Sequence, residues 1–183
     1  MHPIKHFITI TKHRHKVVAY CFKMGIGFQG LFHDLSKYSI AEFWPSAKYY
    51  TGNCSPNDIE RKVKGYSLAW MHHKGRNKHH FEYWVDLVND VYAPVIMPIK
   101  YLKESLCDRI AASRIYLKKK YVSSSALDYY ESKDTSSKMH PLSAAVLKCW
   151  LIWVSELGEK EAINKIKKIK TYEDMKKYVE VEA

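Results

Sequence analysis

The spacing of histidines and aspartates is the feature that most constrains how this chain folds. Imidazole nitrogens and carboxylate oxygens are the ligands that divalent transition metals prefer. A fold that uses them together must bring side chains from distant parts of the sequence to one point. The residues of this series are His13, His33, Asp34, His72, His73, His79, His80 and Asp108. The series predicts a buried site for one or two divalent metal ions (Mn, Fe, Co, Ni, Zn or Mg).

The composition around these residues favours helices over strands. The 183 residues include seven glycines and six prolines, which are few for a turn-rich β fold. Apolar residues make up 46% of the chain, enough for a core that holds ligands in place. We therefore expect a single all-α domain over residues 1–183, a helical bundle. Its metal-site core should span about 11–121, with C-terminal helices at 139–183 packed on it.

Apolar periodicity and capping residues predict where the helices lie. The patterns favour helices over 12–24, 39–50, 55–73, 79–91, 98–121 and 141–157, followed by one or two basic amphipathic helices. Ser39 and Glu42 have the spacing of a capping box. The polar, serine-rich segment 122–138 should be an irregular loop.

The four cysteines do not have the pattern of a disulfide framework. They are widely spaced, without a CxxC pair, and three lie in apolar helical patterns. The first residues lack the continuous apolar run of a secretory signal, and the longest apolar stretches are shorter than a membrane span. We therefore expect a cytoplasmic protein that does not associate with membranes.

The formal net charge of +11 predicts an anionic partner. A phosphorylated small molecule, a nucleotide or a nucleic acid would fit this charge. A solvated, lysine-rich surface would give the same net charge without any such partner. The charge alone therefore leaves both interpretations open.

His33 and Asp34 are adjacent, so both can reach one metal cluster only where the backbone bends or a helix ends. The run from Gly25 to Gly30 allows such a bend. A carboxylate can bridge two cations while an imidazole fixes one of them. Asp108 lies in an apolar helical pattern, where a carboxylate is costly unless a cation or a hydrogen-bond donor meets it.

The doublets His72-His73 and His79-His80 stand seven residues apart. Two helical turns would place them on one face, but Gly75 and Asn77 indicate a break between them. Four imidazoles in nine residues would repel one another if protonated, which favours a metal or a phosphate among them. The basic residues between the doublets also fit a nucleic-acid-binding loop. The spacing does not decide which member of each doublet is a ligand.

The order His13, His33-Asp34, Asp108 resembles the HD-domain superfamily of metal-dependent phosphohydrolases. In that family the first histidine precedes an apolar helix as H-x-x-x-V, which here selects His13 over His15. Longer segments are similar to a bacterial and phage family of unknown function that carries HDLSK and HHxxRNKHH motifs. These segments are HDLSKYSIAEF (33–43), AWMHHKGRNKHHFEYW (69–84) and MPIKYLKESLCD (97–108).

The resemblance implies an HD-domain-like fold with His13, His33, Asp34 and Asp108 as metal ligands. It also implies that the doublets supply one or two further ligands or contact phosphate. Glu104, one turn before Asp108, is a candidate hydrogen-bond partner for a histidine. The candidate catalytic residues are Asp34, Lys37, His73 and His80. The glycine-proline signature of cyclic-dinucleotide phosphodiesterases is missing after the doublet, which argues against that substrate.

Three functions fit these observations. The leading hypothesis is hydrolysis of a phosphate ester by metal-activated water, with a nucleotide as the expected substrate. An HD-type diiron oxygenase would use the same ligands. A non-enzymatic, basic nucleic-acid-binding protein would explain the net charge but would leave Asp34 and Asp108 without a role.

Overall fold

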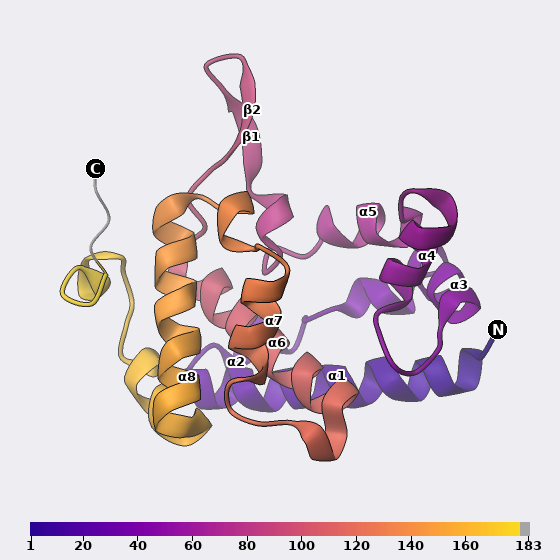
Figure 1. Ribbon diagram of the computed structural model, residues 1–183, viewed down its shortest axis with the longest axis horizontal. Helices are drawn as coiled ribbons and strands as arrows, with labels where there is room; N and C mark the ends of the chain where they lie inside the picture. The colour runs from indigo at the N-terminus through magenta and orange to yellow at the C-terminus, as the bar shows by residue number, and fades with distance from the viewer. Residues whose placement is uncertain (180–183) are drawn as a thin grey trace.

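The computed structural model describes residues 1–179, and these form a predominantly helical domain (Figure 1). The α-helices are α1 (Pro3–Met24), α2 (Gly27–Gly30), α3 (Ile40–Tyr49), α4 (Pro56–Lys64), α5 (Leu68–Lys74), α6 (Ile99–Leu117), α7 (Ser125–Ser132) and α8 (Pro141–Lys167). Strands β1 (Val85–Val88) and β2 (Val91–Pro94) form an antiparallel hairpin. The predicted all-α class is confirmed.

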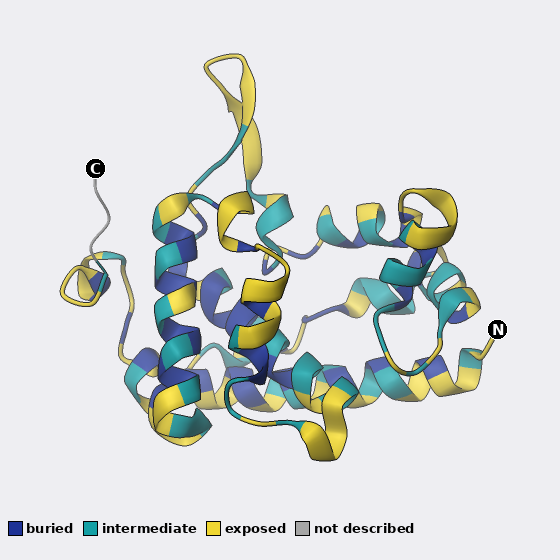
Figure 2. Ribbon diagram, viewed as in Figure 1, coloured by how far each residue is buried: buried dark blue, intermediate teal, exposed yellow. Residues whose placement is uncertain are grey.

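One hydrophobic core lies where α1, α6 and α8 pack against one another. Leu102, Leu106 and Ile110 form the apolar stripe predicted for the long helix, and all three are fully buried. Trp150 on α8 is also fully buried. Burying a leucine or isoleucine side chain contributes about 1.5–3 kcal/mol, so this shared core stabilises the packing of the three long helices. In Figure 2 much of α8 is coloured as buried.

Helix α1 begins at Pro3 rather than near residue 12 as predicted. Its buried face continues toward the N-terminus through Ile10 to His6, in steps of three and four residues from His13. The extension was hidden in the sequence because residues 5–12 mix lysine, histidine and threonine with three apolar residues, and two of these, Phe7 and Ile8, are exposed. Proline at the first turn costs no backbone hydrogen bond, so it suits this helix start.

The predicted helix over 79–91 is wrong, because most of this segment forms the β1–β2 hairpin. Asn89 and Asp90 have positive φ values of 50° and 62°, as a two-residue hairpin turn requires. Val85 pairs with Pro94, and Val88 with Val91. The hairpin projects away from the helices (Figure 1), and its residues are exposed or half-buried.

The predicted helix over 55–73 is interrupted between α4 and α5. Gly65 ends α4 in the left-handed conformation, with φ of 81°. Ser67 starts α5 by accepting a hydrogen bond from the backbone N–H of Trp70. The break reorients the chain just before the first histidine doublet.

The segment 122–138 contains α7, although it was predicted to be irregular. Ala126 and Tyr130 are buried in the core, and α7 packs against α6 and α8. Their burial stabilises a helix whose polar composition gave no such signal. 

At Gly158 the backbone of α8 departs from helical geometry, where the segment starting at Pro141 was predicted to end. The helical path resumes and continues to Lys167. Residues 180–183 of the predicted C-terminal helices lie outside the described residues. Within residues 1–179, no helix combines the length and hydropathy that crossing a membrane requires.

Candidate metal centre

The turn that carries His33 and Asp34 is fixed against α1. A Cβ at Gly30 would lie 2.4 Å from the Cβ of Cys21, so only glycine allows this approach. Arg14 on α1 donates hydrogen bonds to the carbonyl oxygens of Leu31 and of His33. The turn therefore has the bend that the adjacent histidine and aspartate require.

Asp34 has a φ of 55°, a left-handed conformation that few residues other than glycine adopt. Its side chain and that of His33 both point inward, and each residue is 1% exposed. Such backbone strain persists only where the surrounding structure enforces it.

A first group of ligand atoms comes from α1, this turn and α6. His13 Nε2 lies 2.9 Å from Asp108 Oδ1, and His33 Nε2 lies 3.5 Å from the same oxygen. Asp34 Oδ2 lies 3.2 Å from His33 Nε2 and 3.9 Å from His13 Nε2. Ligand atoms around a tetrahedral metal ion with bonds of about 2.0–2.3 Å are about 3.3–3.8 Å apart. The four side chains therefore have the spacing of a coordination sphere.

A second group comes from the same turn, α5 and the residues that follow it. Asp34 Oδ1 lies 3.3 Å from His73 Nε2 and 3.5 Å from His79 Nε2. His80 Nε2 lies 2.8 Å from His73 Nε2. These four side chains could also hold one metal ion.

The two groups share Asp34, and each of its carboxylate oxygens faces a different group. A carboxylate in this position can bridge two cations. The arrangement therefore has the chemistry of a two-metal site, with three further side chains for each ion.

Two buried glutamates contact ligand histidines at Nδ1, the ring nitrogen that does not face Asp34. Glu104 Oε1 lies 2.8 Å from His33 Nδ1 and 3.2 Å from His79 Nδ1. Glu42 Oε2 lies 2.8 Å from His73 Nδ1. A carboxylate at Nδ1 keeps the proton there, so Nε2 is left as the atom that binds metal. Glu104 thus makes the contact with a histidine that its position predicted.

Several of the converging atoms are buried without a hydrogen bond. Among the described residues they are His33 Nε2, His79 Nε2 and Asp34 Oδ1, whereas Asp34 Oδ2 has the ammonium group of Lys37 as a partner. A buried polar atom without a partner is costly, and a carboxylate is more costly than a neutral group. Because these atoms face one another around common points, a divalent cation is a partner that would satisfy them together. The donor set, imidazole with carboxylate, fits that cation.

Charges inside the cluster control its protonation. Burial opposes ionisation of Asp34, but His33, Lys37 and His73 outweigh it and hold the pKa of Asp34 well below its usual range. Burial likewise opposes charge on His33, yet the adjacent carboxylates raise its pKa well above the ordinary value. Hydrogen bonds from His33 and His79 lower the pKa of Glu104 to about 2 against the effect of burial. The carboxylates are therefore ionised at neutral pH and available as ligands.

Residues 2–151 match the model of a protein family described as a family of unknown function, DUF5662. The chain belongs to DUF5662. Comparisons with curated proteins and with solved structures find no match. All side chains of both ligand groups lie inside the matched DUF5662 region.

His72 was predicted to be a metal ligand. In this DUF5662 protein, however, it lies outside both ligand groups. Its Nδ1 lies 2.6 Å from Glu42 Oε1. Neighbouring residues on a helix point about 100° apart, so only His73 of this doublet faces Asp34. Both members of the second doublet, His79 and His80, do reach the second group.

The capping box predicted from Ser39 and Glu42 does not form. Within residues 1–179, no side-chain hydrogen bond caps α3, and Ser39 Oγ is buried without a partner. Glu42 instead contacts His72 and His73, and it is 2% exposed. The sequence pattern was correct for a helix start, but the imidazoles of α5 attract the carboxylate more strongly than a neutral backbone N–H.

Lys37 and Asn77 also lie at the centre. Lys37 Nζ lies 2.5 Å from Asp34 Oδ2, and its side chain is 27% exposed. Asn77 donates hydrogen bonds of 2.8 Å to Ser36 Oγ and to the carbonyl oxygen of His73. Asn77 therefore links the end of α5 to the turn after Asp34. It also stands two residues before the second doublet, His79-His80.

Sequence reasoning missed His6, which is 4% exposed and points toward the interior near the centre. It stands seven residues before His13, so both lie on one face of α1. That spacing is the signal that could have identified it. 

Proposed function

We propose that this protein is a metal-dependent hydrolase of phosphate esters. The observation that carries the proposal is the position of Asp34, whose two carboxylate oxygens each lie within 3.5 Å of imidazole nitrogens of a different ligand group. Two-metal sites of this kind are used for displacement at phosphorus, where both attacking and leaving oxygens need charge stabilisation.

Each ligand group would hold one divalent cation through Nε2 atoms and carboxylate oxygens. The first consists of His13, His33, Asp34 and Asp108, and the second of Asp34, His73, His79 and His80. Cations in these positions would supply Lewis acidity toward phosphoryl oxygens and lower the pKa of water. Glu104 and Glu42 keep the ligand rings in the required tautomer and orientation.

Lys37 is the residue best suited to contact the phosphate directly. Of the four residues predicted to be catalytic, it is the one that belongs to neither ligand group, whereas Asp34, His73 and His80 do. Its ammonium group lies beside Asp34 and its side chain is partly exposed. A fixed positive charge there would stabilise negative charge that develops on phosphoryl oxygens.

The net charge of +11 supports a phosphorylated small molecule or a nucleotide as substrate, because it attracts anions to the surface. The four cysteines are free thiols, which supports a reducing, cytoplasmic setting.

The test is turnover of a panel of nucleotides and simple phosphate esters by protein loaded with Mn, Fe, Co, Ni, Zn or Mg. We expect phosphate release with at least one metal, and its loss in Asp34→Ala. The matched control is Asp86→Ala, which removes an exposed aspartate of the hairpin. Absence of turnover with every metal, or unchanged turnover in Asp34→Ala, would overturn the proposal.

The same samples separate the two alternatives. Iron in the protein with oxygen uptake and without phosphate release would indicate a diiron oxygenase. Salt-dependent nucleic-acid binding by metal-free protein, unaffected by Asp34→Ala, would indicate a basic binding protein. 

A further inference from the structure

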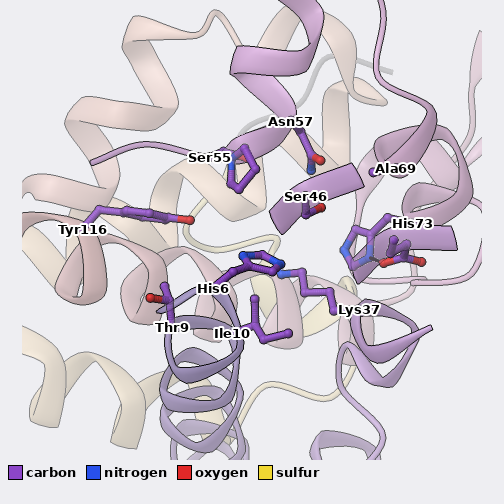
Figure 3. A pocket seen from close by; sticks show the side chains of 12 residues that line it. His6, Thr9, Ile10, Lys37, Ser46, Ser55, Asn57, Ala69, His73 and Tyr116 are labelled. Atoms are coloured by element: carbon purple, nitrogen blue, oxygen red, sulfur yellow. Dashed lines mark hydrogen bonds and ion pairs between the residues drawn. The ribbon is translucent and has the colours of Figure 1, made fainter. Parts of the chain in front are cut away.

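A small cavity of about 60 Å³ adjoins the metal centre (Figure 3). Two residues that line the cavity are also part of the metal centre: His73 is in the second ligand group, and Lys37 contacts Asp34. The remaining walls come from the N-terminal half of α1, from α3, from the start of α4, and from Tyr116 on α6. A group attached to a phosphate at the metals would therefore have this cavity as its neighbour.

The walls away from the metals are uncharged, and polar side chains stand there beside the apolar residues Ile10, Pro56 and Ala69. Hydroxyl groups come from Thr9, Ser46 and Tyr116, and a side-chain amide comes from Asn57. In Figure 3 the side chains of Ser46 and Tyr116 reach toward the middle of the cavity from different elements. Hydroxyls and amides both donate and accept hydrogen bonds, so this lining suits a ligand that also does both.

The charged residues of the lining are already engaged. Glu42 contacts His72 and His73, and Lys37 contacts Asp34. Among the lining residues, no further lysine or arginine is present for a second phosphate, and no further carboxylate for a cation. The cavity therefore favours a neutral group over a polyphosphate chain or an amine.

His6 provides a buried polar atom with no partner. Its Nδ1 has no hydrogen bond among the described residues, although His6 is 4% exposed. Burial, with a contribution from Lys37, lowers the pKa of His6 to about 4, so the ring is neutral at pH 7. A buried nitrogen of this kind costs free energy unless a ligand or water pairs with it.

We propose that this cavity receives the hydroxyl-bearing end of the alcohol part of the substrate, and that this part is a compact group such as a short polyol. The inference rests on the proposed function, because the metal ions would hold the phosphate of the same molecule. The cavity is too small to enclose a nucleobase together with its sugar, so a base would remain outside it.

A matched pair of esters tests the hydroxyl preference. Glycerol phosphate and propyl phosphate have the same charge and the same carbon chain, and they differ by two hydroxyl groups. In calorimetric titrations of the Mn²⁺-loaded protein, we expect glycerol phosphate to bind about tenfold tighter, since each new hydrogen bond adds severalfold. Equal affinities would overturn the inference.

Two conservative variants test the lining residues. Tyr116→Phe and Ser46→Ala each remove one hydroxyl with little change of shape. Each should weaken glycerol phosphate about threefold to tenfold, while propyl phosphate and Mn²⁺ bind as before. Tyr129→Phe, at an exposed tyrosine on α7, is the matched control. Equal weakening of both esters in these variants, or no weakening of either, would contradict the assignment.

These experiments distinguish failure of the proposed subsite from failure of the proposed hydrolase activity. Preferential binding of glycerol phosphate without hydrolysis of any ester would refute the hydrolase and retain the subsite. Hydrolysis of both esters with equal affinity would retain the hydrolase and refute the subsite.

Discussion

Glu104 Oε1 lies 2.8 Å from Nδ1 of His33, the ring nitrogen that does not face Asp34. The same oxygen lies 3.2 Å from Nδ1 of His79, which belongs to the other ligand group. A single buried carboxylate therefore orients one histidine of each group. This contact makes the geometry of the two groups interdependent.

Glu104→Gln should weaken binding of both metal ions, by about tenfold to a hundredfold each. The amide oxygen that replaces Oε1 carries no negative charge, so it holds both imidazole N–H groups less strongly. The amide NH₂ would also replace Oε2, which accepts a hydrogen bond from Gln29. Calorimetric titration with Zn²⁺ measures both affinities. Glu60→Gln is the control, because Glu60 is also buried but contacts Ser67 and Lys64 outside both groups. Loss of affinity at only one of the two sites would contradict the shared role.

Gly30→Ala should destabilise the protein and weaken metal binding together. The new Cβ would meet the Cβ of Cys21 at 2.4 Å, so the turn that carries His33 and Asp34 must move away from α1. Overpacking of this kind costs about 1–3 kcal/mol. Urea unfolding measures the loss in free energy of unfolding, and a Zn²⁺ titration measures the change in metal affinity. In Gly75→Ala the nearest atom is a normal 3.5 Å away, and that variant should show neither effect. A Gly30→Ala protein with unchanged metal affinity would disprove the link.

Lys37→Met should reduce kcat/KM for phosphate esters by about tenfold to a hundredfold while leaving the metal content unchanged. The side chain contacts Asp34 but belongs to neither ligand group, so in the proposed hydrolase its charge would act on the substrate. Lys37→Arg should recover part of the loss. Steady-state kinetics with metal analysis checks this, and Lys12→Met removes an exposed lysine of α1 as the control. Loss of metal in Lys37→Met would show that the lysine instead supports the ligands.

His6 should make the metal-free protein less stable in mild acid. Its pKa is about 4 when folded because of burial and of nearby Lys37, against about 6.5 for an unfolded chain. From pH 6.5 down to about 4 the unfolded state binds the proton and the folded state does not. The free energy of unfolding therefore falls over this window, by at most ~3 kcal/mol from this group.

The check is urea unfolding of chelator-treated protein at several pH values. His6→Gln should lose less free energy of unfolding between pH 7 and pH 4.5 than the wild-type protein. His15→Gln changes an exposed histidine of the same helix and should follow the wild-type curve. Parallel curves for wild type and His6→Gln would rule out this contribution.

The sequence predicted those parts of the molecule that depend on strong local patterns. Leu102, Leu106 and Ile110 repeat at helical spacing, and they form the buried stripe of α6. His33 and Asp34 stand where glycines permit a bend, and the backbone bends there. In both cases the local preference and the tertiary contacts favour the same conformation.

Other parts depended on contacts that no local pattern reports. The spacing of Ser39 and Glu42 has a valid local meaning, but the imidazoles of α5 take the carboxylate. His72 differs from His73 only in which side of a short helix it occupies, and the break at Gly65 sets that orientation. 

The mistaken prediction of a helix over 79–91, where the hairpin forms, has a different cause. The signal of the hairpin was present, since two short, largely apolar segments, VDLV (85–88) and VYAP (91–94), flank Asn89 and Asp90, which accept positive φ. Short apolar runs of this length fit a strand as well as a helix, and the turn residues should have decided between them.

Metal content per chain tests the central claim most directly. Protein purified metal-free, reloaded with Zn²⁺ or Mn²⁺ and freed of excess ion should hold two ions per chain by mass spectrometric metal analysis. Asp108→Ala, which alters only the first group, should hold one, and Asp34→Ala should hold none. A wild-type chain that retains no metal, or an Asp34→Ala chain that retains two ions, would contradict a centre bridged by Asp34.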